Sequence, residues 1–303
     1  MTTVPVAMPA PRALLGRMLI VLAAVCYGLM PLFGTRAHSA GLDTVAVMAI
    51  RFAIAAAGLW TIVAIRRPVM PSWQVSAGAL GLGATCWTLQ SVGYLYAVTR
   101  LGASVAALLL FTYPLMVVIA AVLLKRQRVG RPLLIAFGLV AIGLLLVFAS
   151  GTTGAQLDLF GVIAGVVSAV TYTIYILASE PLSRRTDPFL LMALALTGAA
   201  AATWIVVFAR GGVAVSSMIE AGPPLLGLAL LSTVVAAMAF LLGLKLVGAS
   251  TAALLSCVEV VVACAVAAFA LGDRLTTAQL MGCVVIVAAA VFLNLPQRST
   301  TTN

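Results

Sequence analysis

Long apolar runs, separated by short breaks that contain charged residues, glycine or proline, follow one another along the whole chain. A helix needs roughly 20 apolar residues to cross a bilayer core of about 30 Å. The pattern therefore predicts an all-α membrane protein with ten transmembrane helices. Their expected bounds are Leu14–Phe33, Thr44–Ile65, Val75–Val98, Ala103–Leu124, Pro132–Ala149, Leu159–Ala178, Pro188–Ala209, Pro223–Leu244, Ser250–Leu271 and Ala278–Leu295.

Lysine and arginine residues at the breaks are distributed unequally between the two sides of this arrangement. The side of the N-terminus holds Arg12, Arg17, Arg66, Arg67, Lys125, Arg126, Arg128, Arg131, Arg184, Arg185, Lys245 and Arg298. The other side holds only Arg36, Arg100, Arg210 and Arg274. Positive residues concentrate on the cytoplasmic side of membrane proteins. Both termini are therefore predicted to be cytoplasmic, as in a protein of the bacterial inner membrane.

Part of the chain is repeated. The segment Tyr94–Leu109 returns 146 residues later as Phe240–Leu255, with Gly-Ala-Ser at 102–104 and again at 248–250. Near the start of each half, Gly16 and Tyr27 correspond to Gly161 and Tyr172 at an offset of 145. Chance similarity between two segments rich in Ala and Leu is the alternative, but two regions agree at nearly the same offset. The repeat predicts two five-helix units, over residues 14–149 and 157–295.

Each unit contains an odd number of predicted helices, and this number determines how the second unit is oriented in the membrane. After five crossings, the second unit must enter the membrane from the side opposite to the first. The two units would then be related by a pseudo-two-fold axis in the membrane plane, and such inverted pairs enclose a binding site near the midplane. Scaffolds and channels can also be built from repeats, but scattered polar residues inside the predicted helices favour a carrier.

The composition agrees with a chain that lipid covers over most of its surface. Apolar residues make up 64% of the chain and charged residues only 8%, with a mean hydropathy of +1.22. Soluble proteins keep roughly a quarter of their residues charged. The net charge of +10 comes from residues dispersed at the ends of apolar runs, without a basic helix. Lipid and a small-molecule substrate are the expected partners, and nucleic acid is not.

Signs of a metal, cofactor or enzyme site are missing from the sequence. The five cysteines lie inside apolar runs without a CxxC pair, which indicates thiols that pack as small apolar side chains. No GxxxxGK[ST], HExxH or GxSxG motif is present, and His38 is interpreted as a solvated loop residue. We therefore expect neither enzyme activity nor a cofactor. One chain already holds both units, so the protein is expected to function as a monomer.

The motifs and the topology together resemble the drug/metabolite transporter superfamily, in its EamA type, over Leu14–Leu295. The resemblance rests on the duplicated unit, on Gly-Ala-Ser before a helix in each half, on Arg51 and on Tyr113-Pro114. The segment Leu271–Thr276, followed by Gln279 and Gly282, is similar to the family's Leu-Gly-Glu-x-Leu-Thr, with Asp273 in place of glutamate. The resemblance implies a secondary transporter that works by alternating access. Within the family, the chain looks most like the exporters of amino acids, including aromatic amino acids.

Two departures from the family pattern affect what the resemblance implies. Val260 stands after Glu259, where the family often has a proline, so the ninth helix is expected to be straighter. In the first half, basic residues over 125–128 replace the family's acidic turn residue. Details of gating are therefore not carried over from the family to this chain.

Glu259 is the acidic residue deepest inside a predicted helix. A carboxylate in lipid costs at least a few kcal/mol, so its side chain should face a wet cavity or the protein interior. It could bind a substrate ammonium group, take up a proton during coupled transport, or hold a partner helix. These functional roles are favoured over the structural alternative, a carboxyl group paired with a serine, threonine or backbone group between helices.

Arg51 lies about two turns into the second helix. A buried arginine requires a carboxylate, backbone carbonyls or a substrate anion as a partner, unless its side chain extends to the interface. Because the resemblance implies an arginine here in relatives with different substrates, a structural or gating role is favoured. Pro114, inside the fourth helix, would allow bending and is a candidate for gating.

The third predicted helix carries the most polar side chains. Trp87, Gln90, Ser91 and Tyr94 follow the spacing i, i+3, i+4 and i+7, which places them on one face. Such a face suits a cavity for an amphipathic small molecule, although a polar seam between helices is the alternative. Tyr113 and Tyr172 are also expected to face the cavity, and Tyr113 corresponds to Glu259 in the repeat.

Three functions remain open from the sequence. The first is a secondary carrier that exports amino acids or related small metabolites. The second is a carrier of the same fold for nucleotide sugars, cofactor precursors or organic cations. The third is a non-transport membrane protein or a channel. Glu259 with hydrogen-bonding aromatic residues favours a zwitterionic substrate, because cations would require more acids and phosphates more bases inside the cavity.

Overall fold

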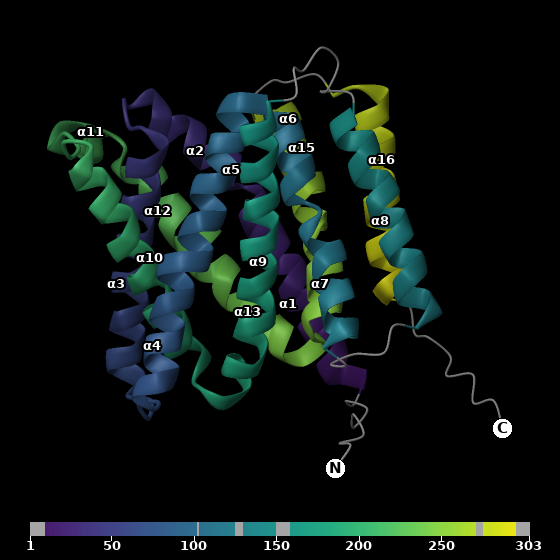
Figure 1. Ribbon diagram of the computed structural model, residues 1–303, viewed down its shortest axis with the longest axis horizontal. Coiled ribbons are helices and arrows are strands. Elements are labelled where there is room, and N and C mark those ends of the chain that lie inside the picture. The colour runs from purple at the N-terminus through teal and green to yellow at the C-terminus, as the bar shows by residue number, and fades with distance from the viewer. Residues whose placement is uncertain (1–9, 102, 125–129, 150–157, 271–274, 295–303) are drawn as a thin grey trace.

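The computed structural model of the protein (Figure 1) describes residues 10–101, 103–124, 130–149, 158–270 and 275–294, and these form helices without any strand. The first half contains α1 (Ala10–Gly28), α2 (Met30–Ser39), α3 (Thr44–Arg66), α4 (Trp73–Leu82), η1 (Gly83–Trp87), α5 (Thr88–Leu101), α6 (Ala103–Leu110), α7 (Tyr113–Leu123) and α8 (Arg131–Ala149). The second contains α9 (Leu159–Arg185), α10 (Pro188–Ala209), α11 (Val215–Glu220), α12 (Gly222–Ala229), η2 (Leu230–Val235), α13 (Ala236–Val247), α14 (Ala249–Ser256), α15 (Val258–Ala270) and α16 (Thr277–Asn294).

The helices agree with the predicted runs, and the all-α membrane fold is confirmed. Within the described residues, eight helices are long and apolar enough to cross a membrane. The third predicted run is helical from Trp73 to Leu101 but is not among these eight, in keeping with its polar side chains. The last run forms a shorter apolar helix, Thr277–Phe292, which is not among the eight. The count of ten crossings stays a prediction.

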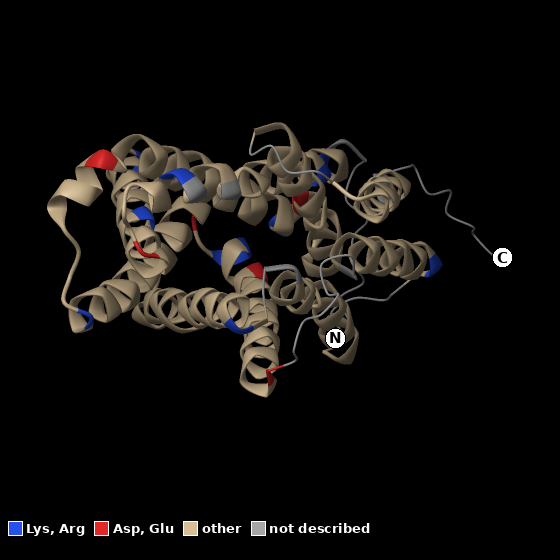
Figure 2. Cartoon of the chain, turned by 90° about the horizontal axis from the view of Figure 1, so that it is seen from above, with Lys and Arg blue, Asp and Glu red and all other residues tan. Residues whose placement is uncertain are grey.

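The helices run between two faces of the protein (Figure 1). The start of α1 and the end of α16 lie at one face, here called the terminal face, and α2 ends at the opposite, distal face. Basic residues at the described helix ends follow the predicted imbalance, with Arg66, Arg67, Arg184 and Arg185 among those toward the terminal face. Charged residues are sparse among the helices when seen from above (Figure 2). Gly102, Lys125, Arg126, Arg128, Leu271–Arg274 and Arg298 lie outside the described residues.

Two ion pairs show the pseudo-two-fold relation between the halves. Asp43 caps the N-terminus of α3 and lies 3.8 Å from Arg210, the C-cap residue of α10. Asp187 caps the N-terminus of α10 and lies 4.0 Å from Arg66, the last residue of α3. Each helix thus contributes the acid at its start and the base at its end. This reciprocity requires α3 and α10 to be antiparallel and places the axis between them.

Close packing elsewhere follows the same relation. A Cβ atom on Gly16 in α1 would lie 2.7 Å from Leu246 Cβ in α13. A Cβ atom on Gly161 in α9 would lie 2.8 Å from Arg100 Cβ in α5. The two glycines matched in the sequence therefore have the same task, which is to let a helix of one half approach the end of a helix of the other.

Interruptions of the helices also occur at equivalent places. The π-helical turns η1 and η2 begin at Gly83 and Leu230, 147 residues apart. The fourth run is interrupted at Phe111 and Thr112, and the ninth at Cys257, which is 146 residues after Phe111. The expectation of a straighter ninth helix was therefore wrong, because this helix is interrupted without a proline. Leu29 separates α1 from α2, whereas α9 is continuous, so the symmetry is broken there.

The crossing of α4 and η1 with α10 gives a test of the packing. A Cβ atom on Gly198 would overlap the carbonyl oxygen of Leu80, and one on Gly83 would overlap that of Ala195. Gly198→Ala should therefore destabilise the protein by about 1–3 kcal/mol, the usual range for overpacking. Gly78→Ala is the control, since nothing lies within 4 Å of its added Cβ. Thermal unfolding in detergent should show a lower midpoint for Gly198→Ala only, and equal midpoints would contradict the close approach.

Candidate functional site

A cavity of about 840 Å³ lies between the two halves. It extends toward the distal face, where Gly34 and His38 of α2, Thr44 of α3 and Gln279 of α16 line it. Its deeper wall comes from η1, α5, α7, α9 and α15. Ligand pockets commonly have volumes of roughly 300–1,000 Å³. The cavity can therefore hold a small metabolite together with some water.

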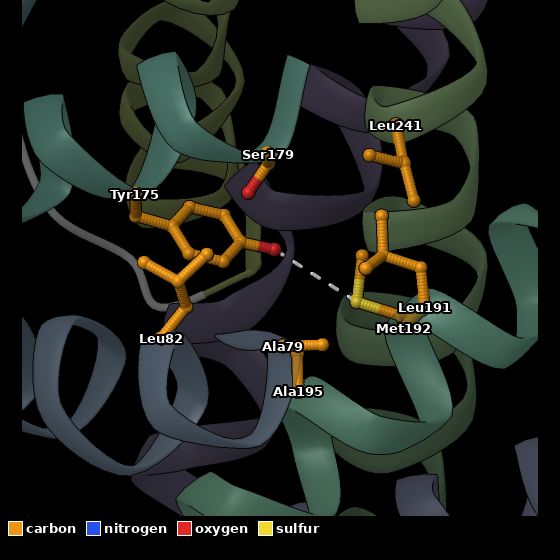
Figure 3. Close-up of a pocket in the computed structure, with 8 residues that line it drawn as sticks. All are labelled: Ala79, Leu82, Tyr175, Ser179, Leu191, Met192, Ala195 and Leu241. Atoms are coloured by element: carbon orange, nitrogen blue, oxygen red, sulfur yellow. Dashed lines mark hydrogen bonds between the residues drawn. The ribbon is translucent and has the colours of Figure 1, made fainter. Parts of the chain in front are cut away.

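Tightly packed side chains close the cavity toward the terminal face (Figure 3). The Tyr175 hydroxyl points at Met192 Sδ, 4.0 Å away, and Leu82 of α4 and Leu241 of α13 line the same small void. The void among these residues has a volume of only about 10 Å³. Tyr175 and Met192 also line the large cavity above, so the group forms its floor. We call it the floor cluster: Ala79, Leu82, Tyr175, Ser179, Leu191, Met192, Ala195 and Leu241.

The residues selected from the sequence converge on this cavity. All but one of them line it: Arg51, Trp87, Gln90, Ser91, Tyr94, Tyr113, Tyr172 and Glu259. Pro114 does not, because it is buried next to Tyr113 in the first turn of α7. Pro114 follows the interruption between α6 and α7, so its fixed φ suits the start of a helix.

The polar face of the third run serves both as a cavity wall and as a helix seam. Ser91 donates a hydrogen bond to Gln90 Oε1 at 3.2 Å, and Ser168 of α9 donates one to the Gln90 carbonyl oxygen at 2.8 Å. Trp87, at the end of η1, packs between Phe52 and Tyr175 with ring centroids 5.7 and 5.1 Å away. The prediction of a cavity wall and the alternative of a polar seam between helices therefore each describe part of this face.

Aromatic rings form a continuous wall beside Glu259. The Tyr113 and Tyr172 rings meet edge to face at 4.6 Å, and Tyr172 stacks on Tyr175 at 6.3 Å. Phe111 extends the wall, because it contacts both Tyr113 and Phe148 at about 6 Å. Such a wall favours an apolar or aromatic portion of a ligand, with tyrosine hydroxyls available for hydrogen bonds. Tyr175, Phe111 and Phe148 were not selected from the sequence.

Glu259 lies in the first turn of α15, just after the interruption at Cys257. Backbone N–H groups at a helix start favour a negative charge nearby. Its carboxylate forms no hydrogen bond or ion pair with any described residue, and it lines the same cavity as the tyrosines at 27, 94, 113 and 172. The interruption of the helix thus places an acid against a set of hydroxyl groups in the cavity wall.

Arg51 is buried, with a relative exposure of 6%, and does not extend to the interface. One guanidinium nitrogen, Nη1, donates to Met30 Sδ at 3.1 Å, and Cζ lies 4.6 Å from the centre of the Phe52 ring. The buried Nε has no hydrogen-bond partner within the described part of the chain. The side chain therefore lines the cavity without an acidic partner among the described residues.

His38 is exposed, as its interpretation as a solvated residue expects, but it does not lie in a loop. It belongs to α2, lines the mouth of the cavity, and its Nδ1 lies 2.8 Å from the Leu42 carbonyl oxygen. Its Nε2 lies 3.3 Å from Thr44 Oγ1. Nothing in the local sequence signals this placement, which depends on how α2 folds over α3. Among the described residues, no group of three or more histidine, cysteine, aspartate or glutamate side chains could hold a metal ion.

Comparison with known proteins gives a consistent result. Residues 14–149 and 159–295 each match the model of the EamA-like transporter family. The chain is 27% identical to the uncharacterized transporter YcbK of Bacillus subtilis, over 90% of both chains. It is 30% identical to an uncharacterized transporter of Archaeoglobus fulgidus, over 91% of this chain and 95% of the other. A crystal structure with 17% sequence identity shares the fold, with a TM-score of 0.79 over 92% of this chain and 98% of the other.

Proposed function

Because the chain belongs to the EamA-like transporter family, we propose that it is a secondary carrier that exports amino acids or related small metabolites by alternating access. It is an integral membrane protein with two repeats of the family's unit. The family resemblance noted from the sequence is thus confirmed, whereas the amino-acid branch belongs to the proposal.

The observation that carries the proposal is the chemistry of the cavity. Glu259 offers one carboxylate for an ammonium group, and the tyrosine wall beside it offers ring surface and hydroxyl groups. A cationic drug would be better served by several acids, and Glu259 is the one acid among the described lining residues. A phosphorylated substrate would be better served by more bases than Arg51 and His38. Amino acids need few charges and fit this lining best.

Alternating access is supported by the relation between the two faces. Counted from the capping aspartates at 43 and 187, Val47 and Met48 correspond to Leu191 and Met192 of the floor cluster. Across the repeat offset of 146, Leu95 and Leu228 correspond to Leu241 and Leu82. All four counterparts line the large cavity. If the two halves exchanged conformations, these four residues would pack together and close the cavity at the distal face.

The orientation and setting of the carrier form part of the same proposal. The excess of basic residues at the terminal face favours the cytoplasm on that side, with the open cavity facing outward. A bacterial inner membrane, a functional monomer and the absence of a cofactor or catalytic activity complete the proposal. One chain holds both halves of the cavity, which supports function as a monomer.

The substrate class can be tested with the purified protein in liposomes. We expect saturable uptake of a subset of the twenty amino acids, with preference for large apolar or aromatic side chains because of the tyrosine wall. The screen would use radiolabelled amino acids with and without a pH gradient, and protein-free liposomes as the control. Absence of uptake of every amino acid, together with uptake of nucleotide sugars or organic cations, would contradict the proposed substrate class.

A further inference from the structure

The two charged residues deep in the cavity are also the places where its internal symmetry fails. Arg51 lies eight residues after the capping Asp43, and its counterpart eight residues after the capping Asp187 is Ala195. Glu259 has Tyr113 as its counterpart, 146 residues earlier. Residues that only support the repeated fold would be expected in both halves. These two charges occur once each, which is the pattern expected of groups that bind different ends of one asymmetric substrate.

Arg51 has no acidic partner in the described structure. Four described acids are committed to ion pairs at the surface: Asp43 with Arg210, Asp158 with Arg100, Glu180 with Arg184, and Asp187 with Arg66. Glu220 is exposed at the end of α11. Glu259 lines the same cavity as Arg51 but forms no ion pair with it. The guanidinium group is therefore buried without a neutralising charge.

The contacts that Arg51 does make do not satisfy its side chain. A guanidinium group has five N–H donors in a planar fork that matches a carboxylate. The sulfur of Met30 is a weak acceptor, and the buried Nε has no partner. A buried charge that lacks both an ion pair and full hydrogen bonding is strongly unfavourable. An anionic group that enters the cavity would remove this penalty, whereas a structural role would have required a partner in the protein.

Glu259 and Arg51 can act on one ligand. Both side chains line the same cavity of about 840 Å³, and Tyr27 forms part of its wall. Tyr172 also lines this cavity and contributes, with Tyr113, to its aromatic wall. One cavity thus presents a base, an acid and an apolar surface to a ligand.

We infer that Arg51 binds the substrate's carboxylate while Glu259 binds its ammonium group, which makes the carboxylate a requirement and the ligand a zwitterionic amino acid rather than an amine. The inference rests on the proposed function in taking this cavity as the transport site. It replaces the structural or gating role that the sequence favoured for Arg51. Arg51 is then a residue that determines specificity.

Three related probes separate the two charges: L-phenylalanine, 3-phenylpropionate, which lacks the ammonium group, and 2-phenylethylamine, which lacks the carboxylate. Binding is measured by calorimetry on the full chain in nanodiscs. Arg51→Gln should weaken binding of phenylalanine and 3-phenylpropionate by at least about tenfold, the usual loss for a hydrogen bond to a charged group. Binding of 2-phenylethylamine should change less than about twofold. Arg51→Lys should restore part of the loss, since it keeps the charge without the planar fork.

Controls distinguish recognition of a ligand from support of the fold. Arg100→Gln removes an exposed arginine that pairs with Asp158 and should leave all three probes unaffected. An equal loss for all three probes in Arg51→Gln would overturn the inference in favour of a structural role. So would wild-type protein that binds 2-phenylethylamine as tightly as phenylalanine, a result that needs no variant to fold.

The outcomes also separate this inference from the proposed function. If no amino acid is transported but 3-phenylpropionate binding still depends on Arg51, the proposed function fails and the carboxylate site stands. If amino acids are transported and Arg51→Gln leaves the discrimination between phenylalanine and 2-phenylethylamine unchanged, the function stands and the inference is overturned.

Discussion

Glu259→Gln should lower the rate of amino-acid transport by about 30-fold or more, because it leaves the substrate's ammonium group in the cavity without an opposite charge. Truncating one partner of a buried charge pair typically costs about 2–5 kcal/mol. Glutamine keeps the shape of the side chain and its reach toward the tyrosines, so the fold should persist. The effect should be larger than that of any single tyrosine substitution, since Glu259 is the one acid among the described residues that line the cavity.

Uptake of radiolabelled phenylalanine into liposomes, at matched protein content, measures this effect. Glu220→Gln is the matched control, because Glu220 is exposed on the short helix α11, away from the cavity. A midpoint of thermal unfolding close to that of the wild type would show that Glu259→Gln is folded. If the folded variant transports at more than about half of the wild-type rate, Glu259 does not bind the substrate. The ratio of uptake with and without a pH gradient would further show whether Glu259 also carries the proton.

Cysteines at positions 95 and 228 should stop nearly all transport once they are cross-linked. Leu95 on α5 and Leu228 on α12 line the large cavity, Leu228 as a buried side chain. Their counterparts, Leu241 and Leu82, both belong to the floor cluster (Figure 3). Alternating access requires positions 95 and 228 to approach each other when the distal face closes. A short bifunctional thiol reagent should therefore capture the closed state, and a reducible linker should allow transport to be restored.

This experiment uses a background in which the five native cysteines are replaced: Cys26, Cys86, Cys257, Cys264 and Cys283. The control pair is Leu82→Cys with Leu241→Cys, which should cross-link in the conformation described here and lock the opposite state. Each single-cysteine variant treated with the reagent shows the effect of modification alone. Full transport with positions 95 and 228 linked would contradict closure of the distal face by these residues.

Much of the fold follows from the sequence, because lipid imposes a simple pattern. An apolar run long enough to cross the bilayer must be helical, since unpaired backbone groups are costly there. The third helix was found in the same way, and its spacing placed Trp87, Gln90, Ser91 and Tyr94 on the cavity. Its polar residues also explain why it is not among the eight helices that are long and apolar enough to cross a membrane.

Interruptions within the helices were not predictable from apolar periodicity. The π-helical turns at Gly83 and Leu230 lie within sequences that could continue as regular helices. The break at Cys257 has no proline to signal it, yet it decides that Glu259 begins a helix and faces the cavity. Tyr175 was missed because its role depends on packing against Met192 of a different helix. Such features arise from contacts between helices, which a single sequence does not display.

Arg51 shows the difference between finding a residue and assigning its role. The sequence indicated a buried arginine and favoured a structural partner for it. Only the spatial arrangement reveals that four acids are paired at the surface and that Arg51 has none of them. The repeat then adds information that neither the motif nor the contact alone provides, because Ala195 occupies the equivalent position in the other half.

Counterflow of phenylalanine in liposomes tests most directly whether the protein is a carrier with a cavity open to one side at a time. Liposomes loaded with unlabelled phenylalanine are diluted into a trace of labelled phenylalanine, with protein-free liposomes as the control. A carrier predicts that the label accumulates transiently above its outside concentration and that this accumulation saturates. Entry of the label that only approaches equilibrium, with a rate proportional to concentration, would contradict the proposal and indicate a channel.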